Sequence, residues 1–568
     1  MAPSAEPKSF LQHRIVRPRA LPVPSRSVKS RVWLTMFAFA TVYAMIATRL
    51  VMLGLAETGE ASAYISAQDS IAAARPDLVD RNGEILATDI KTASLYAEPR
   101  KIIDVDEAIE GLSSVFPDLR NPTVRKRLAS DAGFIWLKRE LTPGQRQKIH
   151  DLGIPGIGFL EENRRFYPGG PTASHVTGIV NVDNEGIAGM ELAVDRAWLR
   201  DLQAAGFASE EALEPVKLSI DLRAQHVVRD EVRQAMERYK AIAGVGIVLD
   251  IKTGEVIAMS SLPDFDPNDR SDALDKDKLN RATAGVYEMG SVFKGFTVAM
   301  ALDSGKVTVE DSFDATRPIR AGGRTINDFH GKNRILSVPE IFIYSSNIGT
   351  VKMMLAAGIE EQQSFLKRVG LTSKLDTELP EIATPLLPKR WRELEAMTIS
   401  FGHGISVTPM QTAVAAAALL NGGRLIPPTF FPRDQATAEA LAEQVVTKRT
   451  SAVMRYLFRL NVLSGSGRRA EVPGYLVGGK TGTAEKIENG RYVSNKRRNS
   501  FLSAFPMDEP RYVVLVVLDE PKPEREGIGA TAGLNAAPTA GAIIRRIAPM
   551  LGVLPKFGEG GDTISISY

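Results

Sequence analysis

Gly290-Ser291-Val292-Phe293-Lys294, followed by Gly-Phe-Thr-Val-Ala-Met-Ala-Leu to Leu302, is the stretch that decides the fold. Its apolar residues predict a buried helix, and Gly290 with Ser291 marks the point where that helix begins. Lys294 follows Ser291 by three residues, so its amine shares a helix face with the serine hydroxyl. Burial disfavours an ammonium ion, and a neutral lysine can accept the serine proton. Ser-x-x-Lys alone is also typical of a surface serine near a surface lysine.

Two further motifs follow in order along the chain. Ser345-Ser346-Asn347 opens a second helical stretch, from Ile348 to Gly358. Gly478-Gly479-Lys480-Thr481-Gly482-Thr483 lies far downstream, before a long apolar strand pattern. Together the three resemble the S-x-x-K, S-x-N and K-T-G motifs of the penicillin-binding protein and serine β-lactamase superfamily. Their order and their domain-scale separations argue against coincidence.

The resemblance implies a role for each residue of the first two motifs. Ser291 is the nucleophile that attacks a peptide carbonyl to form an acyl-enzyme, and Lys294 is its base. Ser345 fits a proton relay toward the leaving amine, and the Asn347 amide can hold the peptide group of the substrate. An alternative for Ser345 is that it only caps the helix ahead of it.

The third motif suits a carboxylate, such as the terminal D-alanine of a peptidoglycan stem. Lys480 supplies a positive charge, and Thr481 and Thr483 share one face of a regular strand. The resemblance also implies an oxyanion hole from the backbone N–H groups of Ser291 and Thr483, with Gly482 letting the substrate lie close to the strand. Strict alternation places Lys480 on the face opposite the threonines, so its side chain must curve round or the strand must twist.

Composition excludes several other classes of function. The 568 residues are 44% apolar and 24% charged, which is ordinary for a globular protein, and a net charge of +3 gives no case for nucleic acid. The chain has no cysteine, and its six histidines never occur in ligand spacing, so we expect neither a metal nor another cofactor. Acids such as Glu381 and Glu393 have no evident place as a base for deacylation, so we expect penicillin to be released slowly.

The N-terminal part predicts a membrane anchor. Residues 1–31 are rich in Pro, Ser and basic residues, which predicts a cytoplasmic tail. Residues 32–55 form an apolar run, uncharged as far as Thr48 and interrupted by Arg49, which is long enough to span a bilayer once. The alternative is a cleaved signal peptide. The basic flank precedes the run, so the remainder of the chain should lie outside the cytoplasmic membrane.

Residues 56–216 are predicted to form an elongated, mixed α+β pedestal. Asn82-Gly83 between apolar runs is a hairpin signal. The stretch from Asp80 to Ala87, and the stretch from Arg165 through Pro168 to Glu191, resemble the two N-terminal boxes of class B penicillin-binding proteins. The family usually has Arg-Gly where this chain has Arg75-Pro76, a departure that should alter a local turn and not the fold.

Residues 217–556 are predicted to form the transpeptidase domain, an α+β fold with an antiparallel sheet and helical layers. A helix over 223–239 precedes strands at 245–250 and 256–260. Further strands at 475–484, 500–505 and 512–518 precede a closing helix at 541–551. Residues 557–568 are polar and are expected to form a tail.

The resemblance as a whole favours a class B D,D-transpeptidase that cross-links peptidoglycan and is acylated by β-lactams. A two-activity class A enzyme is disfavoured, because no glycosyltransferase signature precedes the catalytic domain. Ser345 to Lys352 looks like the S-S-N-V-G-x-x-K pattern of the septal branch, and the chain ends soon after its closing helix. We therefore expect a Gram-negative inner-membrane protein at the division site that binds a multi-span glycan polymerase. The alternatives are an elongation-specific transpeptidase and a non-enzymatic β-lactam sensor or division scaffold.

Overall fold

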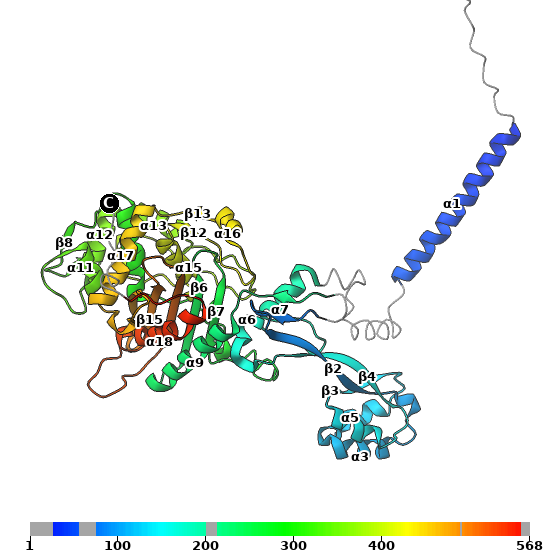
Figure 1. Cartoon of the computed structure of the whole chain (residues 1–568). Helices are drawn as coiled ribbons and strands as arrows, with labels where there is room; N and C mark the ends of the chain where they lie inside the picture. Colours follow the sequence, from blue (N-terminus) through cyan, green and yellow to red (C-terminus); the bar gives the residue numbers. More distant parts are fainter. Residues whose placement is uncertain (1–25, 56–74, 200–212, 489–490, 558–568) are drawn as a thin grey trace, which may run out of the picture. The chain divides into compact units, whose positions relative to one another are not determined.

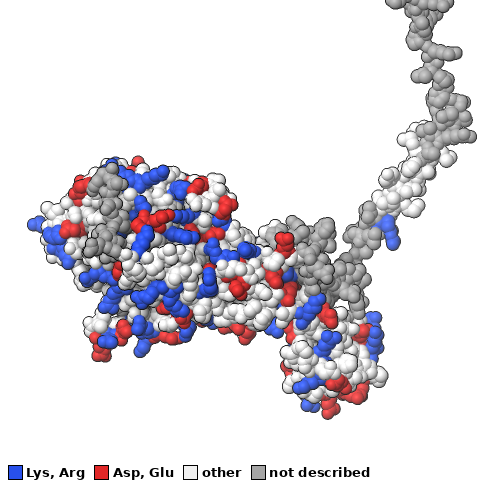
Figure 2. Space-filling view, in the orientation of Figure 1, with Lys and Arg blue, Asp and Glu red and all other residues white. Residues whose placement is uncertain are grey.

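The computed structural model describes residues 26–55, 75–199, 213–488 and 491–557, in two units that comprise residues 1–69 and 70–568 (Figure 1). In the first unit the described residues form one helix, α1 (Arg26–Leu55). Large apolar side chains along α1 are exposed, and most of its described surface is uncharged (Figure 2). Within the described ranges, no helix combines the length and the hydropathy that a membrane span requires.

A five-stranded antiparallel sheet is the centre of the second unit, as the sequence predicted. Alternate residues of its middle strand enter different cores: Val513 and Leu515 pack on one side, and Val514 and Val516 on the other. Both faces of the sheet are therefore covered, which explains why the middle strands are apolar throughout. The strands, in spatial order, are β14 (Gly478–Glu488), β15 (Arg491–Phe505), β16 (Tyr512–Asp519), β6 (Ala243–Asp250) and β7 (Val256–Leu262).

Helices cover each face of this sheet. On one face lie α9 (Leu222–Tyr239) and α18 (Ala536–Met550). α9 can approach β6 closely because of Gly244 and Gly246, where a Cβ would meet the valines of α9 at 2.5 Å. The other layer contains the helices that carry the first two motifs. It includes α10 (Lys294–Asp303), α11 (Val338–Tyr344), α12 (Asn347–Ala357), α13 (Ile359–Arg368), α14 (Glu393–Ser400), α15 (Pro409–Leu420) and α17 (Lys448–Ser464).

Short elements complete this domain, and its predicted helices and strands are present with shifted ends. α18 begins five residues before the predicted start, because Asn535 accepts a hydrogen bond from Ala536 N and caps it. β15 begins at Arg491 and not at Ser500, because its polar first half pairs with the end of β14.

The short elements are β8 (Ser312–Asp314), β9 (Ile319–Ala321), β10 (Arg324–Ile326), β11 (Ile335–Ser337), β12 (Arg424–Leu425), α16 (Gln435–Leu441) and β13 (Glu443–Gln444).

The pedestal is built on a long antiparallel pair, β2 (Ile85–Ala97) with β4 (Ile157–Phe166). The predicted hairpin is confirmed, because Asp80 N donates to Glu84 O at 2.8 Å and Gly83 takes a φ of +95°. At the far end, three helices enclose a separate apolar core. The remaining pedestal elements are β1 (Leu78–Val79), α3 (Val105–Val115), α4 (Pro122–Leu128), β3 (Ile135–Leu141), α5 (Pro143–His150), α6 (Ser174–Thr177), α7 (Gly189–Val194) and β5 (Val216–Lys217).

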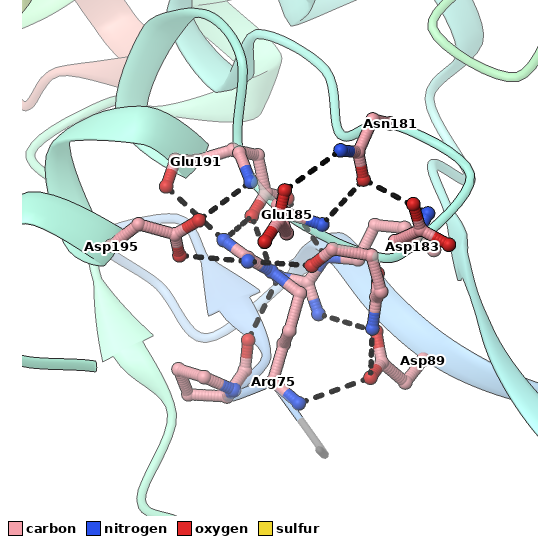
Figure 3. Close-up of polar contacts among 11 residues, drawn as sticks. Arg75, Asp89, Asn181, Asp183, Glu185, Glu191 and Asp195 are labelled. Atoms are coloured by element: carbon pink, nitrogen blue, oxygen red, sulfur yellow. Dashed lines mark hydrogen bonds and ion pairs between the residues drawn. The ribbon is translucent and has the colours of Figure 1, made fainter. Parts of the chain in front are cut away.

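Arg75 of the first N-terminal box meets Arg165 and Glu191 of the second in a buried network (Figure 3). Arg75 donates to Glu191 at 2.7 Å and lies 2.7 Å from Asp195. Arg165 donates to Glu191 at 2.7 Å, to Asp89 at 3.0 Å and to the carbonyl oxygen of the residue after Arg75 at 2.8 Å. Burial opposes the charge of Glu191, but the two arginines together hold its pKa below the ordinary range. The network therefore joins sequence motifs more than 100 residues apart.

The pedestal and the catalytic domain share one apolar core. Leu78, Tyr167 and Met190 of the pedestal belong to the same buried cluster as the sheet residues Ile247 and Leu515. Polar contacts accompany them. Asn268 exchanges hydrogen bonds of 3.0 and 2.9 Å with the backbone of Tyr167, and His175 Nε2 lies 2.7 Å from the carbonyl oxygen of Lys278. The predicted domain start at residue 217 falls on β5, which pairs with β1 of the pedestal.

Candidate active site

Ser291 lies in a tight turn that leads directly into α10. The turn, Gly290–Phe293, is a single 3₁₀ turn in which Ser291 is partly buried and Val292 and Phe293 are fully buried. Gly290 has a φ of +54°, and a Cβ there would meet the carbonyl oxygen of Thr483 at 2.8 Å. On its other side, a Cβ at Gly402 would meet the carbonyl oxygen of Gly290 at 2.0 Å. The serine turn is thus held between β14 and the loop that follows α14.

The second motif forms the junction of two helices. Ser345 ends α11 in a left-handed conformation, with φ 56° and ψ 45°. Ser346, and not Ser345, caps α12 by accepting a hydrogen bond from Gly349 N at 2.9 Å. The alternative that Ser345 caps the following helix is therefore wrong. Asn347 begins α12, and its side chain donates to the carbonyl oxygen of Asn327 at 2.7 Å.

Two buried lysines converge on the Ser345 hydroxyl. Lys294 Nζ donates to Ser345 Oγ at 3.1 Å and also to the main-chain oxygen of Ser345. Lys480 Nζ donates to the same Oγ at 3.0 Å. A serine oxygen has two lone pairs, and the two amines occupy both. The O–H of Ser345 is therefore free to donate to another group.

Burial weakens the charge on both amines. It lowers the pKa of Lys294 well below its usual value, the nearby charge of Lys480 lowers it further, and Asp328 opposes the shift. Burial alone lowers the pKa of Lys480 to about 7. Because the two amines share one hydroxyl, their protonation is coupled and the site resists holding two positive charges.

The third motif keeps strict strand alternation. Lys480 points to the side of the sheet where α11 lies, with its Nζ 5.8 Å from the ring centroid of Phe342. Its Nζ also donates to the main-chain oxygen of Thr481 at 3.3 Å. The threonines face the other way: Thr481 Oγ1 lies 2.6 Å from Ser466 Oγ, and Thr483 Oγ1 accepts from Ala532 N at 3.3 Å. The Lys480 side chain thus reaches Ser345 without a change in the strand.

Gly482 is placed by packing within the protein. A Cβ at this position would meet the main-chain oxygen of Met289 at 2.4 Å and Ser500 Oγ at 2.5 Å. Met289 lies two residues before Ser291 in the sequence. From the sequence, we expected Gly482 to leave space for a substrate near the strand. In the structure, the glycine instead allows the segment that carries Ser291 to lie close to β14.

Residues outside the three motifs also fix the site. Asn461, on α17, is fully buried and donates to the carbonyl oxygen of Gly479 at 2.7 Å while accepting from Ser466 N at 3.1 Å. It therefore fixes the start of the Lys480 strand. No residue spacing in the sequence marks Asn461, because the strand that it binds through Gly479 is a separate element.

A second missed group surrounds Glu288. Its Oε1 accepts from Gly404 N at 2.7 Å and from the Tyr492 hydroxyl at 3.0 Å, and burial raises the pKa of its carboxyl. The ring of His403 lies 5.6 Å from that of Tyr492, and burial and then the charge of Lys294 lower the pKa of His403 to about 4. Glu381 lies elsewhere, accepting from Gly189 N of the pedestal at 3.0 Å.

A serine at the start of a helix, two buried lysines and an edge strand bearing Lys-Thr-Gly define the site of a serine acyl transferase. The sheet that contains this strand lies between two helical layers. The model of the penicillin binding protein transpeptidase domain matches residues 244–545, and the model of the penicillin-binding protein dimerisation domain matches residues 70–194. The chain belongs to the penicillin-binding protein transpeptidase family.

Similar proteins cover nearly the whole chain. The probable peptidoglycan D,D-transpeptidase FtsI of Caulobacter vibrioides is 39% identical over 557 residues, which is 96% of this chain and 92% of that protein. The peptidoglycan D,D-transpeptidase FtsI of Escherichia coli K12 is 30% identical over 524 residues, which is 87% and 86%. The apo TP domain of Burkholderia pseudomallei penicillin-binding protein 3 is 33% identical, with a TM-score of 0.54, and covers 60% of this chain and 98% of that one.

Proposed function

We propose that the chain is a serine-type peptidoglycan D,D-transpeptidase, and that β-lactams acylate its Ser291. The observation that carries the proposal is the convergence of two amines on Ser345 Oγ: that of Lys294, one helical turn after Ser291, and that of Lys480. The names of the similar proteins from Caulobacter vibrioides and Escherichia coli support the same reaction.

The chemistry begins with a neutral Lys294. A neutral amine has two N–H bonds for its two contacts with Ser345 and one lone pair for the proton of Ser291. Ser291 Oγ then attacks the carbonyl carbon of the penultimate D-alanine, and the N–H groups of Ser291 and Thr483 stabilise the oxyanion. Ser345 passes its proton to the departing D-alanine nitrogen as the peptide bond breaks, and Lys294 gives Ser345 the proton that it took from Ser291. An acceptor amine attacks the ester in the reverse sequence, which releases Ser291 and forms the cross-link.

Substrate recognition uses the remaining motif residues. The hydroxyls of Thr481 and Thr483 bind the carboxylate of the terminal D-alanine. Lys480 lies on the opposite face of β14, so its charged form attracts this carboxylate from a longer distance. The Asn347 amide holds the peptide group of the donor stem, and Gly482 keeps β14 close to the serine turn. The same groups bind a β-lactam, whose carboxylate and strained amide present the same chemistry.

Replacement of the nucleophile tests the reaction. Ser291→Ala should abolish covalent labelling of the full chain by a fluorescent penicillin, because no other group supplies the acylated oxygen. Ser364→Ala, on the exposed side of α13, is the matched control and should label as wild type does. Labelling that survives Ser291→Ala, or a label that mass spectrometry places on Ser345, would refute the assignment. Acylation without transfer to an acceptor amine would favour the sensor alternative.

We also propose that residues 32–55 anchor the chain in the inner membrane, with residues 1–31 cytoplasmic and the catalytic domain periplasmic. Support comes from the absence of charged residues between Val32 and Thr48 and from the exposed apolar side chains of α1. The protein should remain in the membrane fraction after a carbonate wash, and protease added to spheroplasts should remove the catalytic domain. Recovery in the soluble fraction would contradict the anchor.

The cellular role we propose is cross-linking of the septum at the division site. The FtsI names of two similar proteins and the segment from Ser345 to Lys352 support it. Depletion should give cells that elongate and fail to constrict, and a multi-span glycan polymerase should co-purify with the wild-type chain. A chain with a foreign anchor in place of residues 32–55 is the control for that contact. Cells that round up while dividing would support the elongation-specific alternative.

A further inference from the structure

Asp328 ties the second motif to a loop that the mechanism does not use. It lies between β10 and β11, where its Oδ1 accepts from Ile348 N at 3.0 Å and its Oδ2 accepts from Ser346 Oγ at 2.7 Å. The preceding carbonyl oxygen accepts from the Asn347 side chain at 2.7 Å. Three consecutive residues at the start of α12, from Ser346 to Ile348, are therefore bound to two consecutive residues of this loop.

These contacts fix the start of α12, and therefore the backbone conformation of Ser345, which directly precedes Ser346. Ser345 has a left-handed backbone, which a non-glycine residue keeps only when its surroundings impose it. The turn is defined on one side by the end of α11 and on the other by the start of α12. Asp328 and Ser346 together fix that start, and a carboxylate at a helix N-terminus also interacts favourably with the helix dipole.

The charge of Asp328 acts on the amine of the first motif. In the described part of the chain, the charged or titratable groups that interact electrostatically with Lys294 are Lys480 from β14, His403 from the loop after α14, and Asp328. Burial and Lys480 both lower the pKa of Lys294, and of these groups Asp328 is the one that raises it. A carboxylate near a buried ammonium favours the charged form.

We propose that Asp328 is a positioning residue for acyl transfer, whose carboxylate fixes the Ser345 turn and places a negative charge beside the turn that binds the Lys294 amine. The inference rests on the proposed roles of Ser291, Lys294 and Ser345. In this proposal, Asp328 also influences the pH at which Lys294 loses its proton and can act as the base. The loop between β10 and β11 therefore contributes to acyl transfer, although it contains none of the three motifs.

Asp328→Asn removes the negative charge of this side chain and retains its hydrogen bonds to Ser346 and Ile348, so the two effects can be measured separately. Asparagine has nearly the same shape, its amide oxygen can still accept from Ile348 N, and its NH₂ group can donate to Ser346 Oγ. Without the negative charge, Lys294 loses its proton at lower pH. The acid limb of the acylation rate, measured on the full chain with a fluorescent penicillin across a pH series, should move to lower pH.

Ser346→Ala is the matched control, because it removes the contact with Asp328 and keeps the charge. It should lower the plateau rate by about ten- to a hundredfold, as expected for a small displacement of a catalytic group. Its acid limb should stay at the wild-type pH. Asp328→Ser, which is neutral and can still cap the helix, serves in place of Asp328→Asn if thermal melting shows that the asparagine variant is not folded.

The outcomes separate this inference from the proposed function. An acid limb that stays at the wild-type pH in the neutral variants overturns the role of the charge. A wild-type plateau rate in Ser346→Ala overturns the role of the contacts. Both results presuppose a wild-type chain labelled at Ser291. A wild-type chain that takes no label there refutes the proposed function itself, and this inference falls with it.

Discussion

Ser345 adopts a backbone conformation that costs a non-glycine residue about 1 to 2 kcal/mol, and it does so at the point where two lysines meet. Two buried amines on one hydroxyl are electrostatically unfavourable unless one of them is neutral. The site resolves this by burial, which lowers the pKa of both lysines. The resulting neutral amine is the group that a serine nucleophile needs as its base.

The pKa of Lys480, at about 7, predicts an alkaline limb in acylation. Its positive charge is present below that pH and is lost as the pH rises through it, so attraction of the β-lactam carboxylate weakens. The second-order rate constant should fall above about pH 7, with an apparent value that belongs to the coupled lysine pair. Lys480→Arg keeps its charge throughout and should lose this limb. A limb unchanged in Lys480→Arg, measured by stopped flow, would contradict the assignment.

Glu288 predicts a pH-dependent stability. Burial raises its pKa above the ordinary 4.5, so its contribution to stability is present at low pH and is lost as the pH rises through the folded-state pKa. Glu288→Gln cannot ionise, and its amide oxygen can accept both hydrogen bonds. The melting temperature of Glu288→Gln relative to wild type should therefore increase as the pH rises above about 4.5. Exposed Glu393→Gln is the control and should show no such trend; a flat difference for Glu288→Gln would contradict the prediction.

At the scale of elements, the site depends on close contact between the serine turn, the loop around Gly402 and β14. Gly482→Ala should disrupt it, because its Cβ would lie 2.4 Å from a main-chain oxygen that cannot move independently. We expect a lower melting temperature and acylation reduced by about tenfold or more.

Gly295→Ala, on α10, is the matched control for Gly482→Ala. Its Cβ would meet only the Phe458 ring at 3.5 Å, and alanine is the better helix former. It should acylate as wild type does and melt no lower. Wild-type behaviour in Gly482→Ala would show that β14 can shift away from the serine turn.

Much of the fold could be predicted because short elements carry their own signals. The apolar run after Ser291 gave α10, and the turn at Asn82-Gly83 gave the first hairpin. Asp328 and Asn461 could not be predicted in this way, because each acts through hydrogen bonds to segments distant in sequence. The first half of β15 was missed for a related reason: its residues are polar, and pairing with β14 alone makes it a strand.

At the scale of the whole molecule, the shared core predicts that the pedestal stabilises the catalytic domain. A chain that begins at Ser70 keeps the complete second unit and should bind penicillin as the full chain does. A chain that begins at Lys217 exposes the apolar surface that Leu78, Tyr167 and Met190 cover. It should melt at a lower temperature, measured by differential scanning fluorimetry. Equal melting temperatures for the two shortened chains would show that the interface contributes little.

The buried network around Arg75 also has a mechanical consequence. Arg75 precedes β1 in the chain, so tension along the chain from its N-terminal side reaches this network before it reaches the sheet of the pedestal. Its backbone N–H is bound to Asp89 and its guanidinium to the Asn184 carbonyl oxygen, Glu191 and Asp195. A pull at this point is shared by several segments and must break these bonds together. The pedestal can therefore bear load where the chain enters it, without peeling apart strand by strand.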